Sequence, residues 1–183
     1  MKIKSNKSRI ILRRTLYSAV LLFLYMLMAG GLFKGWQPIL IIPLAVAVAM
    51  RESEVFASVF GAVCGLVIDL SCDKLFGFSG VWLLPCCLAA SLLVSNLIKV
   101  NLVNFIWLNA AVCFFMALTD YFFRYFLWRA DSASYILVSF TIPSHLSAAI
   151  LSPLIYFLIR LISNKLSPRE RLRLNSFSGN DDE

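Results

Sequence analysis

A carboxylate stands at the end of a row of small residues in the first half of the chain. Ala57, Gly61, Gly65 and Asp69 are four residues apart, so on a helix they share one face. Small residues let a second helix approach closely. A carboxylate in an apolar helix is a candidate reactive group, a partner for a cation or a solvated helix end. The spacing therefore predicts a helix with a smooth groove that ends in a charge.

Other ionisable residues occur in the same predicted layer of the molecule. Asp120 precedes Arg124 by four residues, the order that favours a helical ion pair. We expect these two residues to form an ion pair at the outer rim. Either the pair closes the helix end alone, or Asp69 joins it. His145 is the one histidine, and a lone histidine is more often a packed, hydrogen-bonded residue than a metal ligand or proton relay.

Catalytic motifs are absent from the sequence. It has no Walker A loop, no H-E-x-x-H, no nucleophile elbow and no G-x-G-x-x-G. The five cysteines form no C-x-x-C and fall mostly in apolar runs, which is typical of core residues; they are Cys64, Cys72, Cys86, Cys87 and Cys113. We therefore expect no enzyme, no cofactor and no metal site.

The composition is that of an integral membrane protein. Of 183 residues, 60% are hydrophobic, and the mean hydropathy is +0.82, which excludes an ordinary soluble domain. The net charge of +7 is concentrated near the two ends of the sequence. Basic residues beside a membrane span indicate a cytoplasmic side and anionic lipid as a partner, and nucleic acid is not expected.

Six stretches are predicted to cross a lipid bilayer as helices. They cover residues 15–33, 37–50, 55–70, 81–97, 102–127 and 143–162, with a basic segment at 1–14 and a disordered tail at 163–183. The second stretch is short and needs tight packing to cross. Pro153 is expected to kink the last span, after an interfacial segment at 132–142. Interface markers are expected at Lys34, Trp36 and Pro38.

The distribution of Lys and Arg predicts the orientation. With six spans, 13 of these residues fall on the side of the two termini and 4 on the other side. The positive-inside rule then places both termini in the cytoplasm.

The small-residue face has two alternative interpretations. It either packs against another span of the same chain or accepts the helix of a second protein. The sequence alone leaves both open.

The stretch Gly65-Leu-Val-Ile-Asp69, followed by Gly77 in a turn before the next span, resembles the rod shape-determining protein MreD family. The last span, with its Ser-Pro-Leu-Ile-Tyr run at 152–156 and then Arg160, is similar to that family's final helix. The resemblance covers roughly residues 15–165. It implies helix packing or partner binding at Ala57, Gly61, Gly65, Asp69 and Gly77.

The resemblance also implies a function and partners. A member of this family is a non-enzymatic scaffold in the bacterial cytoplasmic membrane that binds the single-span protein MreC. It acts with MreB filaments, RodA and a class B penicillin-binding protein in lateral wall synthesis, and self-association into a homo-oligomer stays open. The family's all-α fold is similar to the six-helix S-components of energy-coupling factor transporters. The alternative is therefore an S-component that binds a vitamin or metal ion, although few polar residues converge at the predicted outer end.

Overall fold

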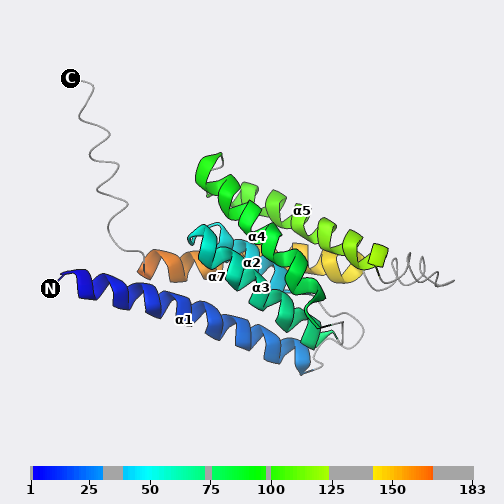
Figure 1. The fold of residues 1–183 in the computed structure, drawn as a ribbon, viewed down its shortest axis with the longest axis horizontal. Coiled ribbons are helices and arrows are strands. Elements are labelled where there is room, and N and C mark those ends of the chain that lie inside the picture. Colours follow the sequence, from blue (N-terminus) through cyan, green and yellow to red (C-terminus); the bar gives the residue numbers. More distant parts are fainter. Residues whose placement is uncertain (1, 31–38, 73–75, 98–99, 124–141, 167–183) are drawn as a thin grey trace, which may run out of the picture.

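The structure, a computed structural model, describes residues 2–30, 39–72, 76–97, 100–123 and 142–166. Within these ranges the chain is helical and has no strand. Figure 1 shows the helices packed side by side along one common direction. They are α1 (Lys2–Ala29), α2 (Ile41–Ala49), α3 (Glu54–Ser71), α4 (Phe78–Asn96), α5 (Leu102–Tyr121) and α7 (Ile142–Leu166).

Five of these helices are long and apolar enough to cross a membrane. The qualifying segments are Ile10–Ala29, Glu54–Ser71, Phe78–Asn96, Leu102–Tyr121 and Pro143–Lys165. Each has at least 18 residues, which at 1.5 Å per residue gives about 27 Å or more. The protein is therefore a multi-pass α-helical membrane protein.

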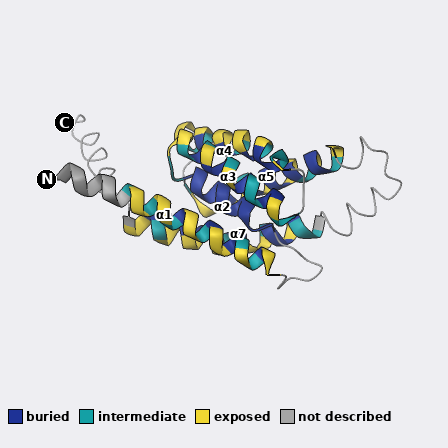
Figure 2. Ribbon diagram, turned by 60° about the horizontal axis from the view of Figure 1, so that its bottom comes forward, coloured by how far each residue is buried: buried dark blue, intermediate teal, exposed yellow. Residues whose placement is uncertain are grey.

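Helix α2 is the centre of the bundle. It packs against all five other helices, and its eight residues other than Pro43 are at most 1% exposed. Figure 2 shows it as a continuously buried element between exposed neighbours. A helix that is apolar on every side is stable only when it is enclosed on every side.

The prediction of a full second span at 37–50 is not supported by the described residues. Helix α2 has nine residues, about 14 Å of helix, which is half of the hydrocarbon thickness. The apolar run is a core element because its neighbours, and not lipid, cover it. Residues 31–38, which include the expected interface markers, lie outside the described ranges.

The bundle begins and ends at the same end. In Figure 1 the start of α1 and the finish of α7 lie together on the left, beside the turn between α2 and α3. The α3–α4 turn, the end of α5 and the start of α7 lie at the opposite end. We call these the terminal end and the opposite end. The two ends of the described chain therefore lie on one side, as predicted, although α2 is not a full span.

Helix boundaries differ from the sequence prediction in several places. Helix α1 starts at Lys2, so the basic segment 1–14 continues the first span. Helix α7 runs to Leu166 and contains Pro153, whereas the predicted span stops at 162. Helix α5 ends at Tyr121. The remainder of the fifth predicted span after residue 123, most of the segment 132–142 and the tail after residue 166 lie outside the described residues.

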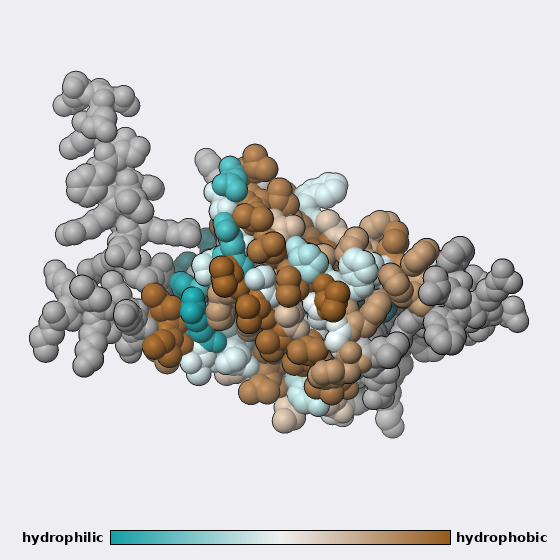
Figure 3. All heavy atoms as spheres, viewed as in Figure 1, coloured by the Kyte–Doolittle hydropathy of each residue, from teal (hydrophilic) through white to brown (hydrophobic). Residues whose placement is uncertain are grey.

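The outer surface of the bundle is apolar. Large hydrophobic side chains such as Phe23, Trp107, Phe114 and Leu154 are 64 to 76% exposed. Figure 3 shows hydrophobic residues spread over the middle of the visible face, with hydrophilic residues gathered towards the terminal end. A contiguous exposed apolar surface of this kind matches a lipid environment.

Candidate functional site

The small-residue face of α3 packs directly against α4. A Cβ added at Gly65 would lie 2.5 Å from the backbone nitrogen of Gly80 and 2.6 Å from the carbonyl carbon of Ser79. A Cβ added at Gly61 would lie 2.7 Å from Sγ of Cys87. These distances are far below van der Waals contact, so only glycine permits the observed approach of the two helices.

Asp69 closes this contact at the opposite end of the bundle. Its two carboxylate oxygens accept the backbone N–H of Ser79 at distances of 3.2 and 3.1 Å. Ser79 lies in the first turn of α4, whose N-cap residue Gly77 has no side chain to do this. The carboxylate of α3 therefore caps the N-terminus of α4 and faces the positive end of its dipole.

Gly77 makes the turn between the two helices possible. Its φ of +91° is in the left-handed region, which residues with a Cβ rarely adopt. Gly65, Asp69 and Gly77 thus build one structural unit, which we call the α3–α4 clamp. Gly65 allows the close approach of the two helices, Asp69 caps α4, and Gly77 allows the turn between them.

The clamp decides between the two interpretations of the small-residue face. That face is covered by α4 of the same chain, and Ala57 and Asp69 are each 1% exposed. The groove is therefore an internal packing surface and is not open to the helix of a second protein. Of the alternatives for Asp69, the solvated helix end does not hold, because the N–H of Ser79 binds this buried carboxylate.

Asp120 and His145 lie on neighbouring helices, α5 and α7. The predicted Asp120–Arg124 pair lies partly outside the described residues. Asp120 is 9% exposed near the end of α5, and His145 is 7% exposed near the start of α7, which packs against α5. Arg124, the predicted partner of Asp120, lies outside the described residues. The Asp120–Arg124 pair therefore stays a prediction.

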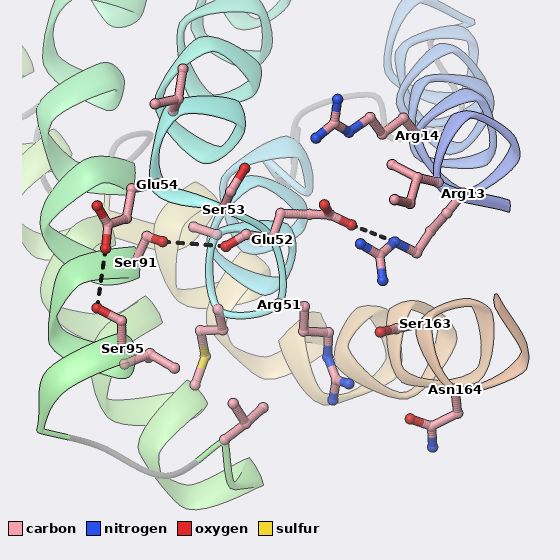
Figure 4. A pocket seen from close by; sticks show the side chains of 16 residues that line it. Arg13, Arg14, Arg51, Glu52, Ser53, Glu54, Ser91, Ser95, Ser163 and Asn164 are labelled. Carbon is pink, nitrogen blue, oxygen red and sulfur yellow. Dashed lines mark hydrogen bonds and ion pairs between the residues drawn. The ribbon is translucent and has the colours of Figure 1, made fainter. Parts of the chain in front are cut away.

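A polar pocket at the terminal end was not predicted from the sequence. Its volume is about 1030 Å³, and α1, the α2–α3 turn, α4 and α7 all contribute to its wall. Figure 4 shows polar side chains from these elements around one open space. The polar lining consists of Arg13, Arg14, Arg51, Glu52, Ser53, Glu54, Ser91, Ser95, Ser163 and Asn164.

An ion pair forms the inner wall of this pocket. Nε of Arg13 on α1 lies 2.6 Å from Oε1 of Glu52 in the α2–α3 turn, and the two side chains are 12% and 2% exposed. The hydroxyl of Ser91 on α4 donates to the backbone carbonyl of Glu52 at 3.4 Å. The turn after α2 is thereby joined to both α1 and α4.

Two further arginines rest on aromatic rings. Cζ of Arg14 lies 4.3 Å from the ring centroid of Phe56, and Cζ of Arg51 lies 5.1 Å from that of Tyr156. Such cation–π contacts hold a guanidinium by its face. Glu54 instead accepts a hydrogen bond from the hydroxyl of Ser95 at 3.2 Å. The sequence offered one signal for this site: Arg13 and Arg14 lie inside an apolar helix, where a charge needs a partner.

The cysteines form no disulfide in the described structure. All five are free, and Cys64, Cys87 and Cys113 are buried. Cys87 fills the space that the missing side chain of Gly61 leaves. This agrees with their interpretation as packing residues.

Over the described residues, fold and sites together define the class as a helical, multi-pass membrane protein with an internal clamp and a polar pocket. No protein-family model, no curated protein and no solved structure shows a significant match to the chain. The function must therefore be argued from the residues themselves.

Proposed function

We propose that the protein is a non-enzymatic membrane scaffold of the MreD type, which binds an MreC-like partner in the bacterial cell-elongation machinery. The observation that carries the proposal is the α3–α4 clamp. The residues of the MreD-like stretch, Gly65 and Asp69 with Gly77, all serve to fix one helix pair. A motif whose residues hold two helices rigidly together suits a scaffold, which must present a fixed surface to its partners.

The partner must bind elsewhere than in the small-residue groove. The opposite side of α3 carries Val55, Val59 and Val63, which are 75%, 57% and 43% exposed and four residues apart. A single-span helix can pack along such a row inside the bilayer. In this proposal the clamp supports the lipid-facing row and does not itself touch the partner.

A membrane pull-down tests the scaffold function. The tagged full-length chain should retain an MreC-like protein from the same genome, and Val59→Trp should weaken retention because a bulky ring interrupts the row. Leu154→Trp, on the exposed face of α7, is the matched control and should bind like the original chain. If both variants still retain the partner, the row is not part of the interface. If the original chain retains no partner, the scaffold proposal is refuted.

Complementation of cell shape tests the role of the clamp. Asp69→Asn should impair rod shape more than Asp131→Asn, because Asp69 caps α4. If the two variants have equal effects at equal protein levels, the clamp is not required for cell shape.

The polar pocket favours a second candidate function, small-molecule binding as in an S-component, but at the terminal end and not at the outer end where the sequence alternative placed the site. Its volume of about 1030 Å³ is at the upper end of the usual range for ligand sites. Mass spectrometry of the detergent-purified protein distinguishes the two functions. A vitamin or metal ion bound at one per chain would replace the scaffold proposal.

The proposed location is the bacterial cytoplasmic membrane, with both termini in the cytoplasm. The support is the 13 to 4 distribution of Lys and Arg; Arg13, Arg14 and Arg51, three of the 13, line the pocket at the terminal end. A reporter that works only in the cytoplasm should be active when fused after residue 166, and a reporter that works only outside the cytoplasm should be inactive there. The opposite result would reverse the proposed orientation.

A further inference from the structure

The pocket at the terminal end holds more guanidinium groups than its carboxylates neutralise. Arg13, Arg14 and Arg51 line it, against Glu52 and Glu54. Arg13 is paired with Glu52. Within the described ranges, neither Arg14 nor Arg51 lies within ion-pair distance of a carboxylate. Both groups are open to an anion, but Figure 4 shows the Arg13–Glu52 pair between them, so that only Arg14 lies beside the start of α3.

Aromatic rings hold these two groups in place. Arg14 lies over Phe56 and Arg51 over Tyr156. A guanidinium that stacks by its face keeps its N–H groups free at the edge, in the plane that suits bidentate contacts to phosphate or carboxylate. The stacking also lowers the conformational entropy that a ligand would otherwise have to remove.

The N-terminus of α3 opens into the same space. Its N-cap residue Ser53 makes no side-chain capping hydrogen bond, and Ser53, Glu54 and Val55 all line the pocket. Phe56, which carries Arg14, belongs to the first turn. Figure 4 shows Glu54 turned towards Ser95 on α4 and Glu52 turned towards Arg13, so that neither carboxylate lies between Arg14 and Ser53. Uncapped amides and a guanidinium therefore lie close together in this corner.

Apolar surface adjoins this corner. Ile11 and Leu12 on α1 are 65% and 52% exposed, and Val55 at the start of α3 is 75% exposed. A soluble anion makes no use of such surface, whereas the acyl chains of a lipid do.

We propose that the pocket binds the phosphate group of an anionic phospholipid, with the N–H groups of Arg14 and the first amides of α3 as donors. The acyl chains then lie against the exposed apolar residues of α1. This site goes beyond the scaffold function and does not depend on it. It gives the terminal end a chemical preference for one class of lipid.

A lipid titration of the full-length chain in detergent tests the proposal by native mass spectrometry. Phosphatidylglycerol should bind at least about tenfold more tightly than phosphatidylcholine with the same acyl chains, because the choline ammonium cancels the charge of the phosphate and is repelled by Arg14. Inorganic phosphate is the soluble probe and should compete only at far higher concentration than the lipid. Equal binding of the two lipids would overturn the site, and phosphate binding as tightly as phosphatidylglycerol would overturn the lipid as its source.

Three variants assign the binding to the pocket. Arg14→Gln should weaken phosphatidylglycerol binding by about tenfold, and Arg14→Lys by a smaller factor, because lysine keeps the charge and loses the planar fork. Arg160→Gln is the control, since Arg160 is exposed on α7 and does not line the pocket. Thermal unfolding without lipid verifies that each variant is folded. Unchanged binding in Arg14→Gln, or an equal loss in Arg160→Gln, would refute the proposal.

Discussion

Replacing Gly65 by alanine should push helices α3 and α4 apart. The added Cβ would lie 2.5 Å from the backbone nitrogen of Gly80, whereas ordinary van der Waals contact begins at 3.4 Å. The obstacle is backbone, which no side-chain rotation can move away. The two helices must therefore separate by about 1 Å at this point.

The separation also breaks the cap on α4. Ser79 lies next to Gly80, and its N–H reaches Asp69 at 3.1 Å, so a shift of about 1 Å lengthens this bond to about 4 Å, beyond hydrogen-bond range. Overpacking of a core costs about 1 to 3 kcal/mol, and a charge-assisted hydrogen bond contributes about 1.5 to 3 kcal/mol. We expect the free energy of unfolding to fall by about 2.5 to 6 kcal/mol.

The assay is thermal unfolding in one detergent, followed by tryptophan fluorescence. Gly80→Ala is the matched control, because its Cβ would meet the carbonyl oxygen of Ala62 at 3.2 Å and needs an adjustment of only a few tenths of an ångström. Gly61→Ala should be intermediate, since its nearest obstacle at 2.7 Å is the side chain of Cys87. Equal unfolding temperatures for the Gly65 and Gly80 variants would refute this reasoning.

Three further predictions use the same unfolding assay. Asp69→Ala should cost about 2 kcal/mol and Asp69→Asn about 1 kcal/mol, because the amide keeps a neutral acceptor; equal costs would exclude a role for the charge. Glu52→Gln should cost about 3 kcal/mol since it strands Arg13 in a largely buried position, and adding Arg13→Gln should recover part of this loss; strict additivity would contradict a direct pair. Ile41→Ala in α2 should cost about 2 to 5 kcal/mol, whereas Leu22→Ala at a 60% exposed position of α1 should stay within about 0.5 kcal/mol; similar losses would contradict the central position of α2.

The long spans were predictable because their signal is local. The predicted span 55–70 differs from α3, Glu54–Ser71, by one residue at each end, since apolar length and flanking polar residues set both. The four-residue spacing that ends at Asp69 also predicted a close helix contact correctly. The identity of the neighbour was not predictable, because nothing local in Gly65 points to Gly80.

The pocket escaped prediction because its residues are distant in the sequence. Arg13 and Glu52 meet only after α1 has packed beside the α2–α3 turn, and the charged run at 51–54 taken alone is typical of a solvent-exposed turn. The sequence does contain a signal for the burial of α2, since Ile41–Ala49 is apolar on every face and too short to span the membrane. Burial by five neighbours is a property of the whole bundle, which no single window of sequence contains.

The central position of α2 constrains the order in which the molecule is made. The helix is too short to rest in lipid by itself, yet α7, which covers part of it, follows after roughly 90 further residues. At about 5 to 20 residues per second, the ribosome needs about 5 to 20 seconds to deliver that cover. During this interval the nascent chain holds an incomplete core inside the membrane. Biogenesis of this protein therefore requires either a hairpin of α2 with α3 that enters as one unit, or an insertion factor that shelters α2 until synthesis reaches the last helix.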